Sequence, residues 1–405
     1  MDAEPLPAAS PISTEPATGV RIVAIDAFRG LVMLLMMAEV LHLGLLTQVF
    51  PDAAWAKAVA YHTDHVEWVG CSLHDLIQPS FSFLVGVALV FSLRNRRSRG
   101  QPRWKSVLHA LWRSLLLVAL GIFLRSLGEE KTYFTFEDTL TQIGLGYFFL
   151  YLLALCPRAV QWSALGLILA GYWLAFLLYP SPPSGFDWQA VGVPPDWAHH
   201  QSGLAAHWDK NSNAAWAFDV WFLNLFPRTA PFHFNDGGYA TLSFIPTLAT
   251  MLLGLLAGGQ LLNGQSPWKT FGWFVLVGAI AWGAGLGLHL ANVCPLVKRI
   301  WTPSWTLFSG GWCLWILALF YLITEIGRLR AWAFPLVVIG MNSIAAYLIA
   351  HLCHHFFSEA WHTHAGHPFA KFGGATAEIL DGVVVLLCYW LCLFWMWRRR
   401  LFLRI

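Results

Sequence analysis

Charged side chains are scarce in this sequence. Of its 405 residues only 12% are Asp, Glu, Lys or Arg, whereas 57% are hydrophobic, and the mean hydropathy is +0.56. Soluble domains carry about twice that share of charge. The composition therefore excludes an ordinary soluble protein and indicates one that crosses a membrane several times. The formal net charge of +3 gives no reason to expect nucleic-acid binding.

Metal-binding cysteine patterns and a leader segment are also missing. The seven cysteines are scattered without the spacing of a zinc or redox site, so no metal is expected, although Cys71 and Cys294 are both predicted on the outer side and could pair. Residues 1–20 have neither a basic start nor an apolar core, which argues against a signal peptide. Their Pro, Ala, Ser and Thr predict a disordered cytoplasmic tail.

What the sequence does contain is ten long apolar runs. About 20 apolar residues are enough to cross ~30 Å of hydrocarbon as a helix. The runs lie near residues 31–50, 75–93, 107–127, 139–156, 161–180, 241–262, 270–290, 304–324, 334–356 and 378–397. They predict an all-α fold, a polytopic transmembrane bundle of about ten helices that forms one domain from 21 to 405. A long extracytoplasmic loop is expected at about 181–240.

Basic residues set the expected orientation. Arginine and lysine are concentrated in the loops on one side of the bundle, which the positive-inside rule makes cytoplasmic. These residues are Arg21, Arg29, Arg94, Arg96, Arg97, Arg99, Arg103, Lys105, Arg158, Lys269, Arg328, Arg330, Arg398, Arg399 and Arg400. Both termini are therefore predicted inside. Lys298 and Arg299 form a basic pair on the outer side, and this exception suggests a functional role.

The segment from 61 to 72 carries a titratable cluster between two apolar runs. It contains His62, Asp64, His65 and Glu67. Uncompensated charge beside hydrocarbon costs several kcal/mol. A loop that only connects two helices has no need of such a cluster, so these residues indicate chemistry.

Short motifs along the chain carry a resemblance. The first is Arg21-Ile-Val-Ala-Ile-Asp26-Ala-Phe28-Arg29-Gly30. It is followed by His65-Val-Glu-Trp68-Val-Gly70, Asp75-Leu-Ile-Gln-Pro79, Phe83-Leu-Val-Gly86, Lys298-Arg299-Ile-Trp301-Thr-Pro-Ser304 and Gly340-Met-Asn342-Ser-Ile-Ala-Ala-Tyr347. In order and spacing these motifs resemble those of the heparan-alpha-glucosaminide N-acetyltransferase family of membrane acyltransferases. The resemblance covers nearly everything from 21 to 356.

The resemblance implies a function. It implies that acetyl is taken from acetyl-CoA on the cytoplasmic side and delivered to a terminal glucosamine or another glycan on the far side of the bilayer. Lysosomal members of the family also carry an N-terminal lumenal domain and an additional helix. Their absence from this sequence implies a bacterial-type homologue in the inner membrane, and a homodimer stays open.

His65 falls on the catalytic histidine of the family. Acyl transfer from a thioester needs a base that takes a proton from the attacking amine or hydroxyl, and imidazole titrates near neutral pH. Asp64 or Glu67 would orient the ring or stabilise its cation. A covalent acetyl-imidazole is the competing role, and a solvated interfacial histidine is the alternative without chemistry.

Four residues are candidates for binding the acceptor. Glu39 and His42 lie three apart in the first apolar run and would share a helix face, although a structural ion pair explains them equally well. Asp75 is expected on the same side of the membrane as the histidine cluster. Asp236 begins Asp-Gly-Gly-Tyr-Ala, where the family usually has Asp-Pro-Glu-Gly. The family's polar Asn near the end of the first helix is replaced by Val40, so acceptor binding is expected to differ.

The candidates for binding acetyl-CoA are Arg29, Lys298, Arg299, Trp301, Ser304 and Asn342. Arg29 would face phosphates, although a helix cap with Asp26 as intrahelical partner explains it more simply. Lys298 and Arg299 would place positive charge near the thioester oxyanion or a phosphate, or act as snorkelling anchors. Asn342 is a lone amide in an apolar helix, and such residues more often tie helices together.

Two outer segments are rich in rings. The loop at 181–240 carries tryptophans whose flat faces suit a sugar ring, or equally an aromatic belt, namely Trp188, Trp197, Trp208, Trp216 and Trp221. Near 351–367 the sequence has six histidines, namely His351, His354, His355, His362, His364 and His367. An interfacial histidine-rich loop is the preferred interpretation over a metal site.

The sequence thus predicts an acetyl-CoA-dependent sugar N- or O-acetyltransferase. A secondary transporter of a sugar or small organic acid is the alternative, because broken helices and an intramembrane Glu39 would be natural there too. The lack of a visible internal repeat argues weakly against it. A non-catalytic assembly protein would explain neither Glu39 nor the cluster around His65.

Overall fold

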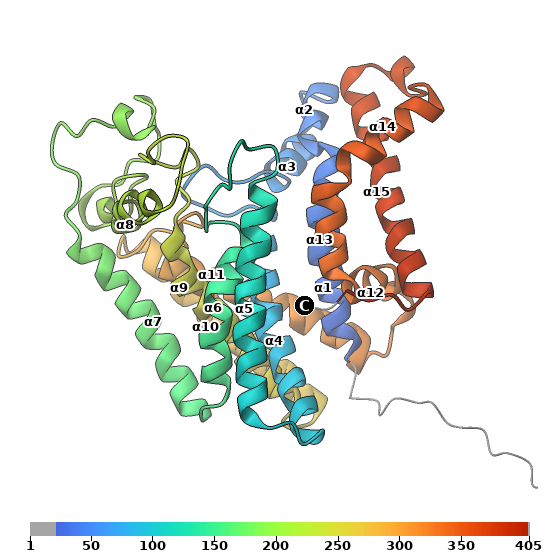
Figure 1. Ribbon diagram of the computed structural model, residues 1–405, viewed down its shortest axis with the longest axis horizontal. Helices are drawn as coiled ribbons and strands as arrows, with labels where there is room; N and C mark the ends of the chain where they lie inside the picture. Colours follow the sequence, from blue (N-terminus) through green and yellow to red (C-terminus); the bar gives the residue numbers. More distant parts are fainter. Residues whose placement is uncertain (1–21, 404–405) are drawn as a thin grey trace, which may run out of the picture.

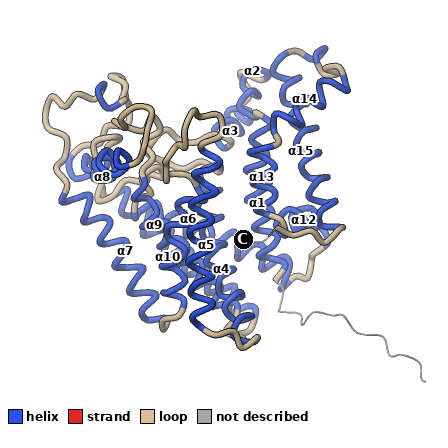
Figure 2. Tube along the Cα trace, viewed as in Figure 1, coloured by secondary structure: helices blue, strands red, loops and turns tan. Residues whose placement is uncertain are grey.

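The computed structural model describes residues 22–403, and in this range the chain is almost wholly helical (Figures 1 and 2). No β-strand occurs between residues 22 and 403; the nearest feature is one isolated antiparallel bridge between Val69 and Val297. The predicted all-α fold is confirmed. The tail predicted at 1–20 lies outside the described residues.

The long helices coincide with the apolar runs of the sequence. They are α1 (Val23–Met37), α4 (Ile77–Ser98), α5 (Arg103–Arg125), α6 (Thr139–Ala154), α7 (Arg158–Leu178), α9 (Phe244–Leu261), α10 (Pro267–Leu290), α11 (Pro303–Tyr321), α12 (Phe334–Met341), α13 (Ser343–Leu352) and α15 (Gly374–Arg398). In the described part of the chain, seven segments are long and apolar enough to cross a membrane, or up to nine if each bent pair is one span. The shorter α6 would be the tenth, so the number ten stays a prediction.

Shorter helices gather at one end of the bundle. They are α2 (Leu46–Val49), α3 (Ala54–His62), α8 (Ala214–Phe222) and α14 (His354–Ala365). Figure 1 shows them at the opposite end from the α4–α5 turn and the start of α7. The arginines around residues 94–103 and Arg158 therefore share one end, as the orientation predicted from the basic loops requires. Which end faces the cytoplasm stays a prediction.

Glycines let the central helices approach closely. A Cβ on Gly86 of α4 would collide with the backbone oxygen of Met251 in α9, and a Cβ on Gly254 of α9 would collide with that of Phe83. Small residues at helix contacts are typical of membrane bundles, because close backbone approach maximises packing there. The Phe83-x-x-Gly86 motif is therefore a packing motif.

The first apolar run is broken where the sequence predicts a continuous helix. α1 ends at Met37, a 3₁₀ turn follows at Ala38–Leu41, and His42 takes a left-handed conformation with φ 45°. The two halves, Val23–Leu41 and Leu43–Val49, meet at 55°. The predicted α-helical repeat therefore ends before Glu39 and His42, and their side chains have different partners: Glu39 lies 3.2 Å from His74, and His42 lies 3.9 Å from Glu378.

A second break lies at Asn342. α12 and α13, on either side of it, belong to a pair of segments that meet at 68°. The side chain of Asn342 is fully buried; its Nδ2 donates to the backbone oxygen of Leu401 at 2.8 Å, and its Oδ1 accepts from the backbone N–H of Leu403 at 3.1 Å. Asn342 thus ties the segment after α15 to the break.

The chain between α7 and α9 forms a cap over the end of the helices opposite the α4–α5 turn (Figure 1). Its core is aromatic: the ring of Trp208 stacks on Phe176 of α7 with 6.1 Å between centroids, and the indole N–H of Trp68 donates to the backbone oxygen of Trp208 at 3.2 Å. Trp208 is fully buried, so it packs the cap and offers no open face to a sugar.

Candidate active site

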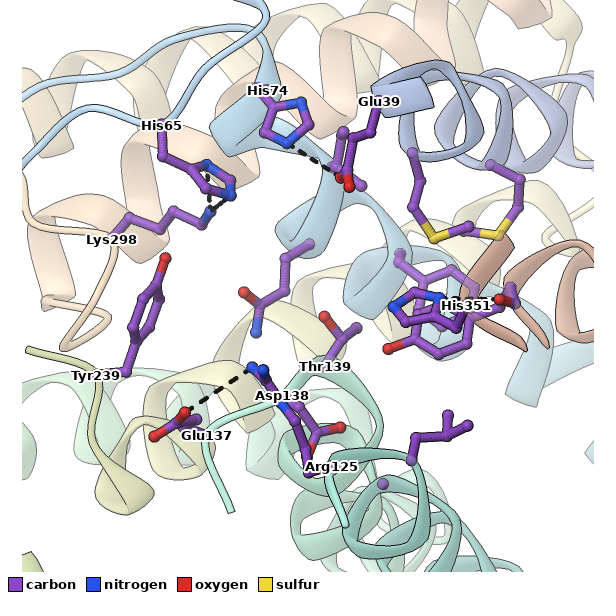
Figure 3. A pocket seen from close by; sticks show the side chains of 18 residues that line it. Glu39, His65, His74, Arg125, Glu137, Asp138, Thr139, Tyr239, Lys298 and His351 are labelled. Atoms are coloured by element: carbon purple, nitrogen blue, oxygen red, sulfur yellow. Dashed lines mark hydrogen bonds and ion pairs between the residues drawn. The ribbon is translucent and has the colours of Figure 1, made fainter. Parts of the chain in front are cut away.

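A cavity of about 350 Å³ lies between the cap and the helices. Figure 3 shows three walls, and polar side chains project from each of them. The first wall carries His65, Tyr239 and Lys298, the second Glu39, His74 and His351, and the third Arg125, Glu137, Asp138 and Thr139. The cavity therefore brings together four residues singled out in the sequence, His65, Glu39, Lys298 and His351.

The loop that carries His65 is pinned to a distant loop. The backbone N–H of Gly70 donates to the oxygen of Leu296 at 3.0 Å, and Val69 pairs with Val297 in the isolated bridge. This contact joins the loop after α3 to the loop after α10. It explains how His65 and Lys298, 233 residues apart in the sequence, line one wall.

Asp75 fixes the tautomer of His65. The Nδ1 atom of His65 lies 2.8 Å from Oδ1 of Asp75, and Oδ2 accepts from the backbone N–H groups of Ser72 at 3.0 Å and Val66 at 3.3 Å. These donors stabilise the ionised carboxylate. An ionised carboxylate only accepts, so Nδ1 of His65 carries the proton. The lone pair of Nε2 is then the one that can act as a base, and the ammonium of Lys298 lies 3.5 Å from it.

Lys298 favours an ionised Asp75 and a neutral His65. Its ammonium lies 3.2 Å from Oδ1 of Asp75 and 3.0 Å from Nδ1 of His65, and its side chain is 5% exposed. Burial lowers the pKa of Lys298, while Asp75 opposes this effect. Burial also lowers the pKa of His65; the hydrogen bond to Asp75 opposes the shift and the charge of Lys298 adds to it. His65 is therefore a neutral imidazole near neutral pH.

The other walls present hydrogen-bond acceptors. Oε1 of Glu39 lies 3.2 Å from Nε2 of His74, and the side chain of Glu39 is 60% exposed to the cavity side. Glu137 lies 3.8 Å from Arg125 and accepts from Nδ2 of Asn235 at 2.8 Å. Burial raises the pKa of Glu137, and Arg125 opposes this shift. These groups suit a ligand rich in amine or hydroxyl groups.

A second cavity of about 330 Å³ continues toward the other end of the bundle, and Phe81 lines both. Arg29 and Arg113 line this inner cavity. Arg113 donates to the hydroxyl of Tyr147 at 3.1 Å, and its buried Nε has no partner among the described residues. Arg29 lies 3.9 Å from Asp26. Two arginines line this cavity and no carboxylate does, which favours an anionic ligand.

A third cavity of about 450 Å³ lies farther along α4, α5 and α6, which also contribute to the lining of the second cavity. It is lined by Arg96, Arg97 and Arg103, and no carboxylate lines it. Along α4 the lining residues run from Gln78 and Phe81, through Val85 and Ala88, to Leu93 and Arg96. The three cavities thus form a row from the histidine to the arginine-rich end.

Comparison with known proteins identifies the relatives. The chain is 23% identical to the heparan-alpha-glucosaminide N-acetyltransferase of Mus musculus, an alignment that covers 100% of this chain and 63% of that protein. It is 24% identical to the Homo sapiens protein of the same name, over 89% of this chain and 57% of that protein. The chain is therefore distantly similar, over most of its length, to proteins of this name.

The same comparison limits what this similarity shows. The chain spans less than two thirds of the length of both relatives, which are N-acetyltransferases by name. No family model matches the sequence. The activity, donor and acceptor of this chain are therefore matters for proposal.

The two acids predicted to orient His65, and the acceptor candidate His42, do not line the cavity. Asp64 is exposed, and its carboxylate accepts from the backbone N–H of His65 at 2.7 Å, not from the ring. Glu67 lies 3.4 Å from His199 in the cap. His42 lies 3.9 Å from Glu378. Neither acid is the partner that orients the imidazole of His65.

Two further acceptor candidates also occupy other places. Asp236 is exposed and lines a separate surface cavity of about 360 Å³. Asp75 is fully buried, so it cannot touch an acceptor directly and acts on it only through His65.

Of the four donor candidates between residues 298 and 304, one lines the cavity and three do not. Lys298 lines the catalytic cavity, whereas Arg299 donates to the backbone oxygens of Gly237 at 2.8 Å and Val66 at 3.3 Å. Trp301 is buried and donates to the hydroxyl of Thr250. Ser304 is buried and donates to the oxygen of Pro295 at 2.6 Å.

Sequence reasoning missed several lining residues: His74, Arg113, Arg125, Glu137 and Tyr239. Arg113 had a usable signal, because an arginine inside an apolar run requires a partner or a ligand. Tyr239 had none, since a lone tyrosine in a long loop has no diagnostic pattern.

The cysteines take no part in the site. Cys71 and Cys294 are both free, so the disulfide considered from the sequence is absent from the structure. Burial raises the pKa of the Cys71 thiol to about 12, which leaves it protonated and unreactive. Among residues 22–403 no three His, Cys, Asp or Glu side chains are grouped to hold a metal ion.

Proposed function

We propose that the chain is a membrane acetyltransferase that moves an acetyl group from acetyl-CoA to an amino sugar, glucosamine-like or part of a glycan, on the opposite side of the bilayer. The observation that carries the proposal is the row of three cavities. The row extends from the arginine-rich end of the bundle to a neutral histidine under the cap, and we infer that donor and acceptor reach one site from its two ends.

The inner cavities suit the donor. Acetyl-CoA carries phosphate groups at one end and a thioester at the end of a long, thin arm. Arg96, Arg97 and Arg103 would bind the phosphates of the nucleotide end, and Arg29 and Arg113 would hold the phosphate nearer the arm. The arm then extends past Phe81 toward His65.

The outer cavity suits proton transfer to His65. Nε2 takes a proton from the amine as the amine nitrogen attacks the thioester carbonyl carbon. When the tetrahedral adduct collapses, the C–S bond breaks and the imidazolium returns the proton to the departing thiolate. Asp75 keeps Nδ1 protonated throughout, so the ring is oriented for both transfers. The products are the N-acetyl sugar and CoA.

The wall that carries Glu39 would receive the acceptor. Its exposed carboxylate, and that of Glu137 on another wall of the cavity, can accept hydrogen bonds from amine and hydroxyl groups of a sugar. O-acetylation would use the same base and the same wall. An amine is favoured because a neutral amine nitrogen is a stronger nucleophile toward the thioester than a hydroxyl, and its N–H groups can donate to Glu39 and Glu137.

Thermal-shift titration of the purified protein tests the donor site. Acetyl-CoA should raise the melting temperature, because a ligand that binds the native state stabilises it. Acetyl-CoA lacking its 3′-phosphate should raise it less. Changing Arg96→Ala with Arg103→Ala should erase the difference between the two donors, while Arg99→Ala, whose side chain does not line the cavity, should preserve it.

A protein that showed no stabilisation by millimolar acetyl-CoA or CoA, and no acetyl transfer to glucosamine, would contradict the proposal. The transporter hypothesis would then be preferred.

A further inference from the structure

Tyr239 lies on the same cavity wall as His65 and Lys298, and the mechanism proposed above gives it no role. Figure 3 shows its ring beside Lys298, with the hydroxyl pointing toward Lys298 and His65. Tyr239 lines the cavity, and its hydroxyl has no hydrogen-bond partner among the described residues. It is therefore a donor available to a ligand.

The ring of Tyr239 is held in place from several sides. The guanidinium of Arg299 lies 5.0 Å from the ring centroid, and two backbone oxygens fix Arg299 in turn. The backbone N–H of Tyr239 donates to Oδ1 of Asn235 at 3.1 Å. Next to it, Gly238 has φ 75°, and a Cβ there would meet the ring of Trp68. The hydroxyl is thus positioned before any ligand binds.

The charges around the cavity decide where a negative oxygen can sit. Glu39 and Glu137 on the other walls would repel an oxyanion, whereas Lys298 beside His65 would attract it. Burial raises the pKa of Tyr239, and Arg299 opposes the shift. The phenol therefore keeps its proton at working pH and remains a donor.

We propose that the hydroxyl of Tyr239, together with the ammonium of Lys298, donates hydrogen bonds to the acetyl carbonyl oxygen as it becomes an oxyanion. This inference rests on the proposed acetyl transfer. As the amine nitrogen bonds to the carbonyl carbon, the C=O π electrons move onto the oxygen. They return when the C–S bond breaks. Tyr239 keeps its proton throughout, and His65 carries the transferred one.

The test is Tyr239→Phe, which keeps the ring under Arg299 and removes only the hydroxyl. Loss of one preorganised oxyanion donor lowers kcat by about 10²–10³-fold. The KM for acetyl-CoA and the melting temperature should stay close to those of the parent, because the donor acts mainly in the transition state.

Tyr133→Phe is the matched control. Tyr133 also lies under an arginine, with the guanidinium of Arg228 5.1 Å from its ring, but it lines the separate surface cavity. This variant should keep full turnover. Equal losses in the two variants, or a Tyr239→Phe protein with parental kcat, would overturn the inference.

A second measurement does not depend on the stability of the Phe variant. A difluorotyrosine incorporated at position 239 ionises at lower pH than tyrosine, so kcat should acquire an alkaline decline as the phenol loses its proton. A purely structural ring would show no such decline, and that result would overturn the inference. If the parent chain transfers no acetyl group at all, the proposed function itself fails, which is a distinguishable outcome.

Discussion

At the scale of single residues, the proposed chemistry depends on the protonation state of one imidazole. A histidine acts as a base only if the right nitrogen is unprotonated, and its neighbours decide which one that is. For His65 this neighbour is Asp75, whose Oδ1 lies 2.8 Å from Nδ1 of the ring. Because Asp75 is fully buried, its contribution is to position the ring.

His65→Ala should lower turnover by about 10²–10⁴-fold, because it removes the general base. Donor affinity should stay near the parental value, since the arginines proposed to bind the donor lie in the other two cavities. The control is His62→Ala, whose exposed ring only accepts from the backbone N–H of Leu73. Steady-state kinetics with acetyl-CoA check both. Near-parental turnover in a folded His65→Ala protein would rule out the base mechanism.

The pH profile gives an independent check on the same residue. Burial lowers the pKa of His65, and Lys298 lowers it further against the opposing effect of Asp75. The base must be unprotonated, so kcat/KM should rise with pH through an inflection below the pKa of a free histidine. An inflection above that pKa would mean that another group, or a protonated His65, controls the reaction.

At the scale of elements, α4 carries residues that line all three cavities. Its leading turn carries Asp75, its middle carries Phe81 where two cavities meet, and its inner end carries Arg96. The position of α4 against α9 depends on Gly86 and Gly254. A helix that lines three cavities must be held rigidly, and close packing on a second helix provides this.

Gly86→Ala should therefore destabilise the protein by about 1–3 kcal/mol, the usual cost of overpacking. The added methyl group would collide with the backbone of α9, which no rotamer change relieves. Gly166→Ala in α7 is the matched control, because a Cβ there meets nothing within 4 Å. Melting temperatures in detergent compare the two. Equal stability of both variants would contradict the packing role of Gly86.

At the scale of the whole molecule, the row of cavities requires the two ends of the bundle to face different compartments. The arginine-rich cavities lie toward one end and the cap covers the other. The basic loops predict that the arginine end is cytoplasmic.

Labelling of single cysteines in intact cells tests this orientation. A membrane-impermeant maleimide should react with Ser184→Cys in the cap, above the level of the parent chain, without permeabilisation. It should react with Arg99→Cys only after the membrane is opened. The reverse pattern would place the arginine cavities outside, where acetyl-CoA is not available.

The sequence by itself determined the all-helical membrane fold, because the length and hydropathy of each run are properties of consecutive residues. It also pointed to His65 through a local motif. The number of spans is harder to predict from the sequence, because the breaks after Met37 and at Asn342 depend on contacts with distant segments. For the same reason it could not show that Glu39 and His42 lie on different parts of a bend.

Only the tertiary structure decided which groups meet at the candidate site. Asp64 and Glu67 are nearer to His65 in the sequence, yet Asp75 contacts the ring, because a folded loop returns the chain to it. Lys298 reaches His65 through the pairing of two loops, and Tyr239 reaches the same wall from the cap. Hydropathy fixes where helices form, whereas contacts between loops far apart in the chain fix which side chains share a cavity.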